Sequence, residues 1–130
     1  MYTFQALTDF SLSSTLALRA CLEWAKRTGI KTTLTHINNF LYEYGVDPIG
    51  PMKENIREKI DQQLKEAATN REGVDALIAE NTLESGLEEV VKDENTKIIF
   101  VGAKGHGLVS RILVGSTSEK LLHMANQPVV

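Results

Sequence analysis

The sequence is poor in several features, and each shortage narrows what the protein can be. It holds one cysteine, Cys21, in 130 residues, so no disulfide can form within the chain and a reducing, cytoplasmic setting is expected. No apolar run reaches the roughly 18 residues that a membrane-spanning helix needs. The N-terminal residues MYTFQALTDF lack the basic and long apolar segments of a secretion signal.

Basic residues are also outnumbered by acidic ones. There are 14 lysines and arginines against 17 aspartates and glutamates, which gives a formal net charge of −3. This balance argues against a broad basic face for nucleic acid. The composition, 42 % hydrophobic and 24 % charged, is typical of a globular protein, and the length suits one domain spanning residues 1–130.

Segments typical of strands alternate with segments typical of helices along the whole chain. The strands are expected at residues 2–8, 31–37, 74–80 and 97–101, with 128–130 beginning a fifth strand that the chain does not complete. The helices are expected at about 11–28, 52–67, 83–91 and 116–126. This alternation predicts a doubly wound α/β fold, with a parallel sheet and helices on both faces.

Spacing within the helical segments predicts which of their faces are buried. The first helix repeats apolar residues every four positions, which predicts a buried stripe of Leu12, Leu16, Ala20 and Trp24, with Ala17 and Cys21 beside it. Cys21 is therefore expected to be a small buried hydrophobe and not a nucleophile. Gly29 is expected to end this helix. In the second helix, the face of Lys, Glu, Asp and Gln is expected to be solvated.

A glycine-rich segment, GAKGHGLVSRILVGS, follows the most apolar strand and runs from Gly102 to Ser116. Gly102 and Gly105 allow positive φ and let the backbone N–H groups approach a ligand, where successive N–H groups form a concavity for anions. Gly115, Ser116 and Thr117 open a helix whose free N–H groups favour phosphate. The segment therefore predicts a polyphosphate site, although it lacks the Lys-Ser/Thr end of a P-loop. The alternative is that these glycines only shape turns.

At these residues the chain resembles the universal stress protein family in its ATP-binding branch. The nucleotide motif of that family, G-x2-G-x9-G-S/T, matches from Gly102 to Ser116 without a gap. The segment TDFS at 8–11 resembles the family's first strand-to-helix turn, and LTHI at 34–37 resembles the end of its second strand. The resemblance implies a five-stranded sheet in the order 3-2-1-4-5, with strand 5 truncated here.

The resemblance also implies a ligand and the residues that hold it. The ligand would be an adenine nucleotide, ATP or else AMP or ADP, with Mg²⁺ carried by the phosphates. Thr8 and Asp9 would face the adenosine part, and Ile37 would hold adenine through backbone hydrogen bonds and apolar contact. The ribose and phosphates would meet Gly102, Gly105, His106, Gly107, Gly115, Ser116 and Thr117.

The implied function is that of an ATP-binding stress-response regulatory protein, a nucleotide-dependent switch that forms a homodimer and has an unidentified protein partner. The first alternative is a slow ATP hydrolase or nucleotidyl-transferring enzyme, with Asp9 or His106 as its candidate base. The second is a relative without ATP that acts through protein contacts alone. Asp9 could also simply cap the first helix, and His36 is expected to be a hydrogen-bonded strand-end histidine. No His/Cys cluster has the spacing of metal ligands.

Overall fold

The computed structural model describes residues 2–38, 50–67, 73–102, 125 and 127–130. Its centre is a four-stranded parallel sheet in the order β3-β2-β1-β4. The strands are β1 (Thr3–Leu7), β2 (Lys31–Asn38), β3 (Val74–Glu80) and β4 (Thr96–Phe100). Each lies within one residue of the bounds predicted from the sequence, so the α/β class and the order of these strands are confirmed.

The predicted fifth strand is present only as a single bridge. Val129 pairs in parallel with Ile99 of β4, so the described sheet has four strands and not five. Three backbone hydrogen bonds hold this end of the chain: from Ile99 N–H to Pro128 O at 3.0 Å, from Val130 N–H to Ile99 O at 2.8 Å and from Val101 N–H to Val130 O at 2.9 Å.

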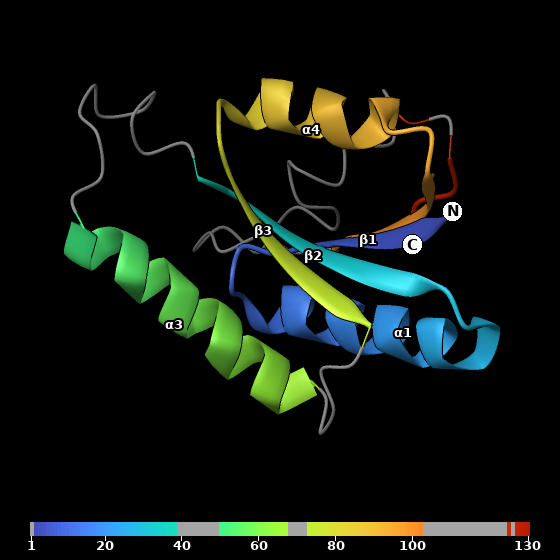
Figure 1. Cartoon of the computed structure of the whole chain (residues 1–130), viewed down its shortest axis with the longest axis horizontal. Coiled ribbons are helices and arrows are strands. Elements are labelled where there is room, and N and C mark those ends of the chain that lie inside the picture. Colours follow the sequence, from blue (N-terminus) through green and yellow to red (C-terminus); the bar gives the residue numbers. More distant parts are fainter. Residues whose placement is uncertain (1, 39–49, 68–72, 103–124, 126) are drawn as a thin grey trace, which may run out of the picture.

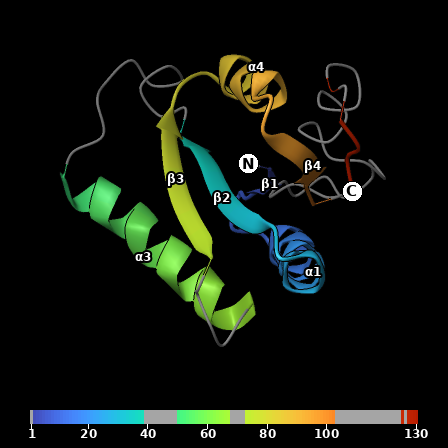
Figure 2. The same cartoon turned by 45° about the vertical axis from the view of Figure 1, so that its right-hand side comes forward.

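Three described helices cover the two faces of the sheet. Helices α1 (Leu12–Thr28) and α3 (Gly50–Ala67) lie on one face, and α4 (Leu83–Lys92) lies on the other (Figure 1). Figure 2 shows the same layers from the side, with β3 at the free edge between α3 and α4. The last predicted helix, residues 116–126, lies outside the described residues except for Ala125.

Each face of the sheet has its own apolar core. The cluster of buried residues on the face of α1 and α3 consists of Phe4, Ala6, Leu18, Cys21, Leu34, Ile60, Leu64 and Phe100. The face of α4 buries Leu7, Leu87, Val90 and Ile99. Successive residues of β1 and β4 alternate between the two clusters, because neighbouring side chains of a strand point to opposite faces. Both strands are therefore buried on both sides, as parallel strands usually are.

Residues next to α1 and α4 in the chain cap these helices, and Gly29 ends α1 as predicted. Ser11 is the N-cap of α1, where its side chain accepts a hydrogen bond from Ser14 N–H. Gly29 ends the same helix in the left-handed conformation with φ of 73°, and its N–H reaches Ala25 O at 2.8 Å. Thr82 caps α4 in the same way through Ser85 N–H. These ends are decided locally, by residues next to one another in the chain.

The buried face of α1 differs from the predicted stripe. Leu12, Leu16 and Trp24 are 75 %, 53 % and 49 % exposed, whereas Leu18 and Cys21 are fully buried. Trp24 keeps one contact with the sheet, an edge-to-face approach to Phe100 with ring centroids 6.3 Å apart. In the first turn, Ser14 and Thr15 are buried and their hydroxyls form hydrogen bonds within the fold, whereas the leucines on either side are exposed. The buried face of α1 is therefore rotated away from the predicted stripe.

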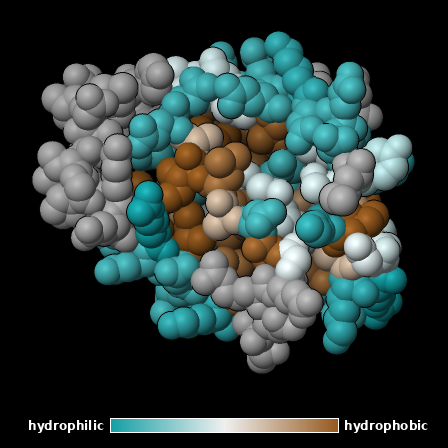
Figure 3. Space-filling view, viewed as in Figure 1, coloured by the Kyte–Doolittle hydropathy of each residue, from teal (hydrophilic) through white to brown (hydrophobic). Residues whose placement is uncertain are grey.

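Strand β3 leaves apolar surface at the free edge of the sheet. Leu77 is 51 % exposed, and Ala76 beside it is also exposed. Figure 3 shows brown, apolar side chains gathered between the hydrophilic surfaces of the flanking helices. The edge follows from the topology, because β3 pairs with β2 and with no other described strand.

Candidate functional site

The described part of the predicted site lies at the carboxyl ends of three neighbouring strands. Thr8 and Asp9 directly follow β1, Ile37 is the penultimate residue of β2, and Gly102 lies two residues beyond β4. Because β2, β1 and β4 are adjacent and parallel, these ends meet at one edge of the sheet. The chain turns from β1 to β2 on one side and reaches β4 on the other, so this is the point where ligands usually bind in open α/β sheets.

Gly102 lies directly against the first turn of α1. A Cβ atom at this position would be 2.7 Å from Ser13 Oγ and 2.9 Å from both Ser13 C and Ser14 N. Two of these three atoms belong to the backbone and cannot rotate away, so only glycine fits here. The glycine that begins the motif is thus explained by a contact 88 residues distant in the chain, between Gly102 and Ser14.

The turn that carries Asp9 is held by hydrogen bonds from its own residues. Asp9 Oδ1 accepts from Ser11 N–H at 3.0 Å, and Thr8 Oγ1 accepts from Phe10 N–H at 3.0 Å. Asp9 is therefore not the N-cap of α1, a role that Ser11 fills, but its carboxylate still shapes the approach to the helix. Phe10 has φ of 67°, a left-handed conformation that is uncommon for a residue with a side chain.

A buried polar cluster lies beneath this turn, and the sequence analysis did not find it. Thr8, Ser14, Thr15 and Gln63 are each no more than 7 % exposed. The Thr8 hydroxyl donates to Gln63 Oε1 at 2.7 Å, and Gln63 Nε2 donates to Ser14 Oγ at 3.2 Å and to Thr15 Oγ1 at 3.0 Å. Thr8 Oγ1 and Ser14 Oγ also lie 3.0 Å apart.

Gln63 was expected on the solvated face of its helix, and that prediction is wrong. The apolar stripe of α3 continues through Ile56, Ile60 and Leu64, and Gln63 follows Ile60 by three residues. Residues three apart share one helix face, so the spacing placed Gln63 beside the stripe. A glutamine at an apolar position is the signal that could have revealed it.

His36 packs behind the Asp9 turn. Its Nδ1 lies 2.9 Å from Thr8 O, and because a carbonyl only accepts, Nδ1 is the nitrogen that carries hydrogen. Burial lowers the pKa of His36 below its usual 6.5, against smaller raising effects from the Thr8 carbonyl and the Asp9 charge. The centroid of the His36 ring lies 4.5 Å from the centroid of the Phe10 ring. His36 is thus a hydrogen-bonded strand-end histidine, as the sequence analysis predicts.

Ile37 lies on the face of the sheet that α4 covers. A Cβ on Gly86 of α4 would be 2.8 Å from Ile37 Cδ1, so the glycine lets helix and side chain approach closely. The last pair between β1 and β2 is Leu7 with Thr35, so the backbone of Ile37 extends two residues past the end of β1. This leaves the backbone of Ile37 beyond the β1 ladder, on the side where Asp9 lies.

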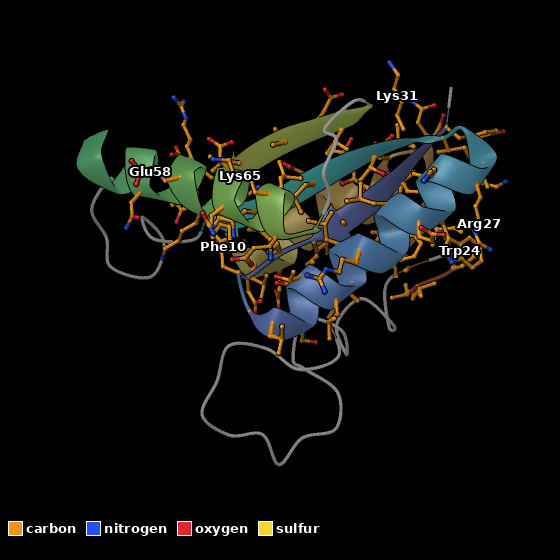
Figure 4. The ribbon with its side chains drawn as sticks, turned by 90° about the horizontal axis from the view of Figure 1, so that it is seen from below. Phe10, Trp24, Arg27, Lys31, Glu58 and Lys65 are labelled. Carbon is orange, nitrogen blue, oxygen red and sulfur yellow. The ribbon has the colours of Figure 1, made fainter. Side chains whose placement is uncertain are left out.

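The remaining predicted site residues lie outside the described part of the chain. They are Gly105, His106, Gly107, Gly115, Ser116 and Thr117, so their roles stay predictions. Figure 4 shows the described end of the site from below, with Phe10 beside α3 and with Trp24 and Arg27 at the other end of α1.

Three further features of the described residues bear on function: the thiol of Cys21, possible metal ligands and the length of the helices. Cys21 is buried, and burial raises the pKa of its thiol to about 11, so the reactive thiolate is disfavoured at neutral pH. Across the described ranges, no three His, Cys, Asp or Glu residues come together as a metal site. None of the described helices has the length and apolar character needed to cross a membrane.

The comparisons with known proteins agree with this architecture. The Universal stress protein family matches residues 6–130, and the chain belongs to this family. A universal stress protein of Mycolicibacterium smegmatis is 35 % identical over 83 residues, which cover 60 % of this chain. The match covers only 28 % of that relative's own length, so this chain corresponds to a part of it.

Solved structures show the same fold at low sequence identity. Universal stress protein UspA from Lactobacillus plantarum superposes with a TM-score of 0.81 at 16 % identity and covers 99 % of this chain and 95 % of its own. A universal stress protein from Archaeoglobus fulgidus gives 0.67 at 17 % identity, covering 100 % and 97 % of the two chains. A universal stress protein in complex with cAMP gives 0.68 at 19 % identity, covering 99 % and 94 %.

Proposed function

We propose that this protein binds an adenine nucleotide, ATP in the first place, at the carboxyl edge of the sheet and acts as a nucleotide-dependent regulatory switch. The observation that carries the proposal is the contact of Gly102 with the first turn of α1, which brings the start of the glycine motif beside the turn of Asp9. A relative of the same fold is described in complex with cAMP, which is also an adenine nucleotide.

The described residues fit the adenosine half of such a ligand. Asp9 offers a carboxylate beside the N-terminus of α1, and Ile37 offers backbone that reaches past β1. The phosphates would lie on the N–H groups of the glycine motif, where Gly105, His106, Gly107, Gly115, Ser116 and Thr117 follow Gly102 in the sequence. Mg²⁺ would accompany the phosphates, since it usually keeps several waters and few protein ligands.

The test is a calorimetric titration with ATP and Mg²⁺ on protein freed of nucleotide, with the heat signal followed afterwards for hydrolysis. We expect saturable binding without turnover. Gly115→Val should abolish binding, because its side chain would occupy the space of a phosphate, while unfolding curves stay close to those of the wild type. Arg27→Ala, at the far end of α1, is the control and should bind normally. Unchanged ATP affinity in Gly115→Val would refute the phosphate assignment.

The same titration separates the alternatives. Steady turnover would favour the ATP hydrolase or nucleotidyl-transferring enzyme, with Asp9 or His106 as base, and Asp9→Asn should then lose rate more than affinity. Absence of binding by nucleotide-free protein would favour action through protein contacts alone. The homodimer, an unidentified protein partner and a cytoplasmic location also belong to this proposal. Sedimentation equilibrium would test the homodimer, with a mass of twice 14.4 kDa as the expected result.

A further inference from the structure

We propose that Gln63 of α3 is a positioning residue, which sets the geometry of the Thr8–Ser11 turn and thereby the affinity of the adenine-nucleotide site. The proposal rests on the proposed function for its ligand, but its geometric part concerns the protein alone. It assigns a role in the site to a helix that carries none of the predicted site residues.

Gln63 reaches from α3 to the end of β1 by hydrogen bonds. Its amide oxygen accepts from the Thr8 hydroxyl, and its amide nitrogen donates to the hydroxyls of Ser14 and Thr15. The side chain therefore spans both ends of the turn, from the residue after β1 to the first turn of α1. All four side chains are buried and satisfied, so the connection is shielded from competing water.

The turn needs such support because its backbone is strained. Phe10 adopts φ of 67°, a left-handed conformation that is unfavourable for a residue with a side chain and persists only where the surroundings enforce it. The Phe10 N–H donates to Thr8 Oγ1, the same oxygen whose hydrogen goes to Gln63. Losing Gln63 removes the acceptor of the Thr8 hydroxyl and leaves Ser14 Oγ, 3.0 Å away, as the remaining support of the oxygen that accepts from Phe10 N–H.

A second contact from α3 acts on the same residue. Lys59 lies one helical turn before Gln63, and its Nζ is 5.7 Å from the centre of the Phe10 ring. The other neighbour of that ring is His36, itself bonded to Thr8 O. Displacement of α3 would therefore disturb Thr8 and Phe10 together. Asp9 lies between these two residues, so its carboxylate would move with them.

The experiment compares Gln63→Met with Gln62→Met, two substitutions of equal size at neighbouring positions. Gln62 is exposed and bonds only to Glu66 among the described residues, so its variant controls for helix composition. Val90→Ala is a second control, because Val90 lies in the last turn of α4 and is buried against the opposite face of the sheet. The readouts are amide hydrogen exchange in the nucleotide-free protein and the Kd for ATP with Mg²⁺.

In Gln63→Met we expect exchange at Phe10 and Ser11 to rise about tenfold or more, as for a lost buried hydrogen bond, and ATP affinity to fall about tenfold. The Ser85 amide, held by Thr82 Oγ1 in α4, is the internal reference and should not change. Val90→Ala should lower stability while leaving the Kd at the wild-type value.

Two outcomes would overturn the proposal. Unchanged exchange at Phe10 and Ser11 in Gln63→Met would show that the glutamine does not hold the turn. Equal loss of ATP affinity in Gln63→Met and Val90→Ala would show that only general stability matters. If wild-type protein does not bind ATP, the proposed function fails, but the exchange experiment still decides whether Gln63 positions the turn.

Discussion

Helices α1 and α4 differ in whether their regularly spaced apolar residues are the buried ones. In α4 the apolar residues Leu87 and Val90, three positions apart on one face of the helix, are buried. In α1 the equally regular Leu12 and Leu16 face outward, and the hydroxyls of Ser14 and Thr15 face inward. No polar side chain of α4 is among its buried residues, whereas α1 begins at the candidate site. A helix that serves a site can bury polar side chains at the expense of its apolar stripe.

The largest loss of stability is expected for a substitution that tests which face of α1 is buried in the core. Leu18→Ala should destabilise the protein by about 2–5 kcal/mol, because Leu18 is fully buried and its truncation leaves a cavity. Leu16→Ala, two positions away on the same helix and half exposed, should change stability by less than about 0.5 kcal/mol. Urea unfolding of both variants measures this. Equal losses would mean that the stripe read from the sequence is the buried one.

A smaller effect on stability is expected at two glycines, Gly102, which lies against α1, and Gly86, which is part of α4. Gly102→Ala should cost about 1–3 kcal/mol, because the new Cβ would press on the backbone of Ser13 and Ser14. Gly86→Ala would press on side-chain atoms alone, namely Cδ1, Cγ2 and Cγ1 of Ile37 at 2.8–3.0 Å, and alanine favours the helix by up to about 1 kcal/mol, so its net cost should be the smaller one. Denaturant midpoints decide between them, and a larger loss for Gly86→Ala would contradict this ranking.

The smallest effect concerns the pH dependence of stability near the Asp9 turn. His36 has a folded-state pKa below its unfolded value of 6.5, so the unfolded chain binds the proton more readily. His36 therefore contributes its full stability above pH 6.5, and this contribution declines as the pH falls from 6.5 toward the lowered pKa. Asp9 and Lys59 are the charged groups that face the ring, with opposite effects on its pKa.

The matched variant is His36→Asn, whose side-chain amide can still donate to Thr8 O but does not titrate. We expect the wild type to lose more thermal stability than His36→Asn between pH 7.5 and pH 5.5. Parallel pH profiles for the two proteins would show that His36 is not the group responsible. Taking the difference between the two profiles removes the contribution of other titrating groups.

Much of the fold could be predicted from the sequence because it depends on residues that are close together in the chain. Strand bounds followed from apolar, β-branched runs, and helix ends followed from Ser11 and Gly29. The fifth strand was predicted from the ending QPVV, and in the described residues it forms a single bridge. Gly102 was singled out for its bare backbone, and the structure explains this glycine by its packing against Ser13 and Ser14.

The rest depended on contacts between distant segments. Gln63 looked like surface because its helix is mostly charged, and only the packing of α3 against α1 brings its amide to the Thr8 hydroxyl, 55 residues away. The orientation of α1 was misjudged for the same reason. Gln63 Nε2 donates to the hydroxyls of Ser14 and Thr15, and these two hydrogen bonds form only when α3 is in place.

By itself the sequence determined the alternation of strands and helices, the caps, the glycine motif and the family resemblance, since local conformational preference and residue spacing fix each of these. Only the tertiary structure decided which face of α1 is buried, why Gly102 admits no side chain and which residue of α3 holds the Asp9 turn. The physical reason is that a buried polar group must find a partner, and its partner here comes from a different element of the fold.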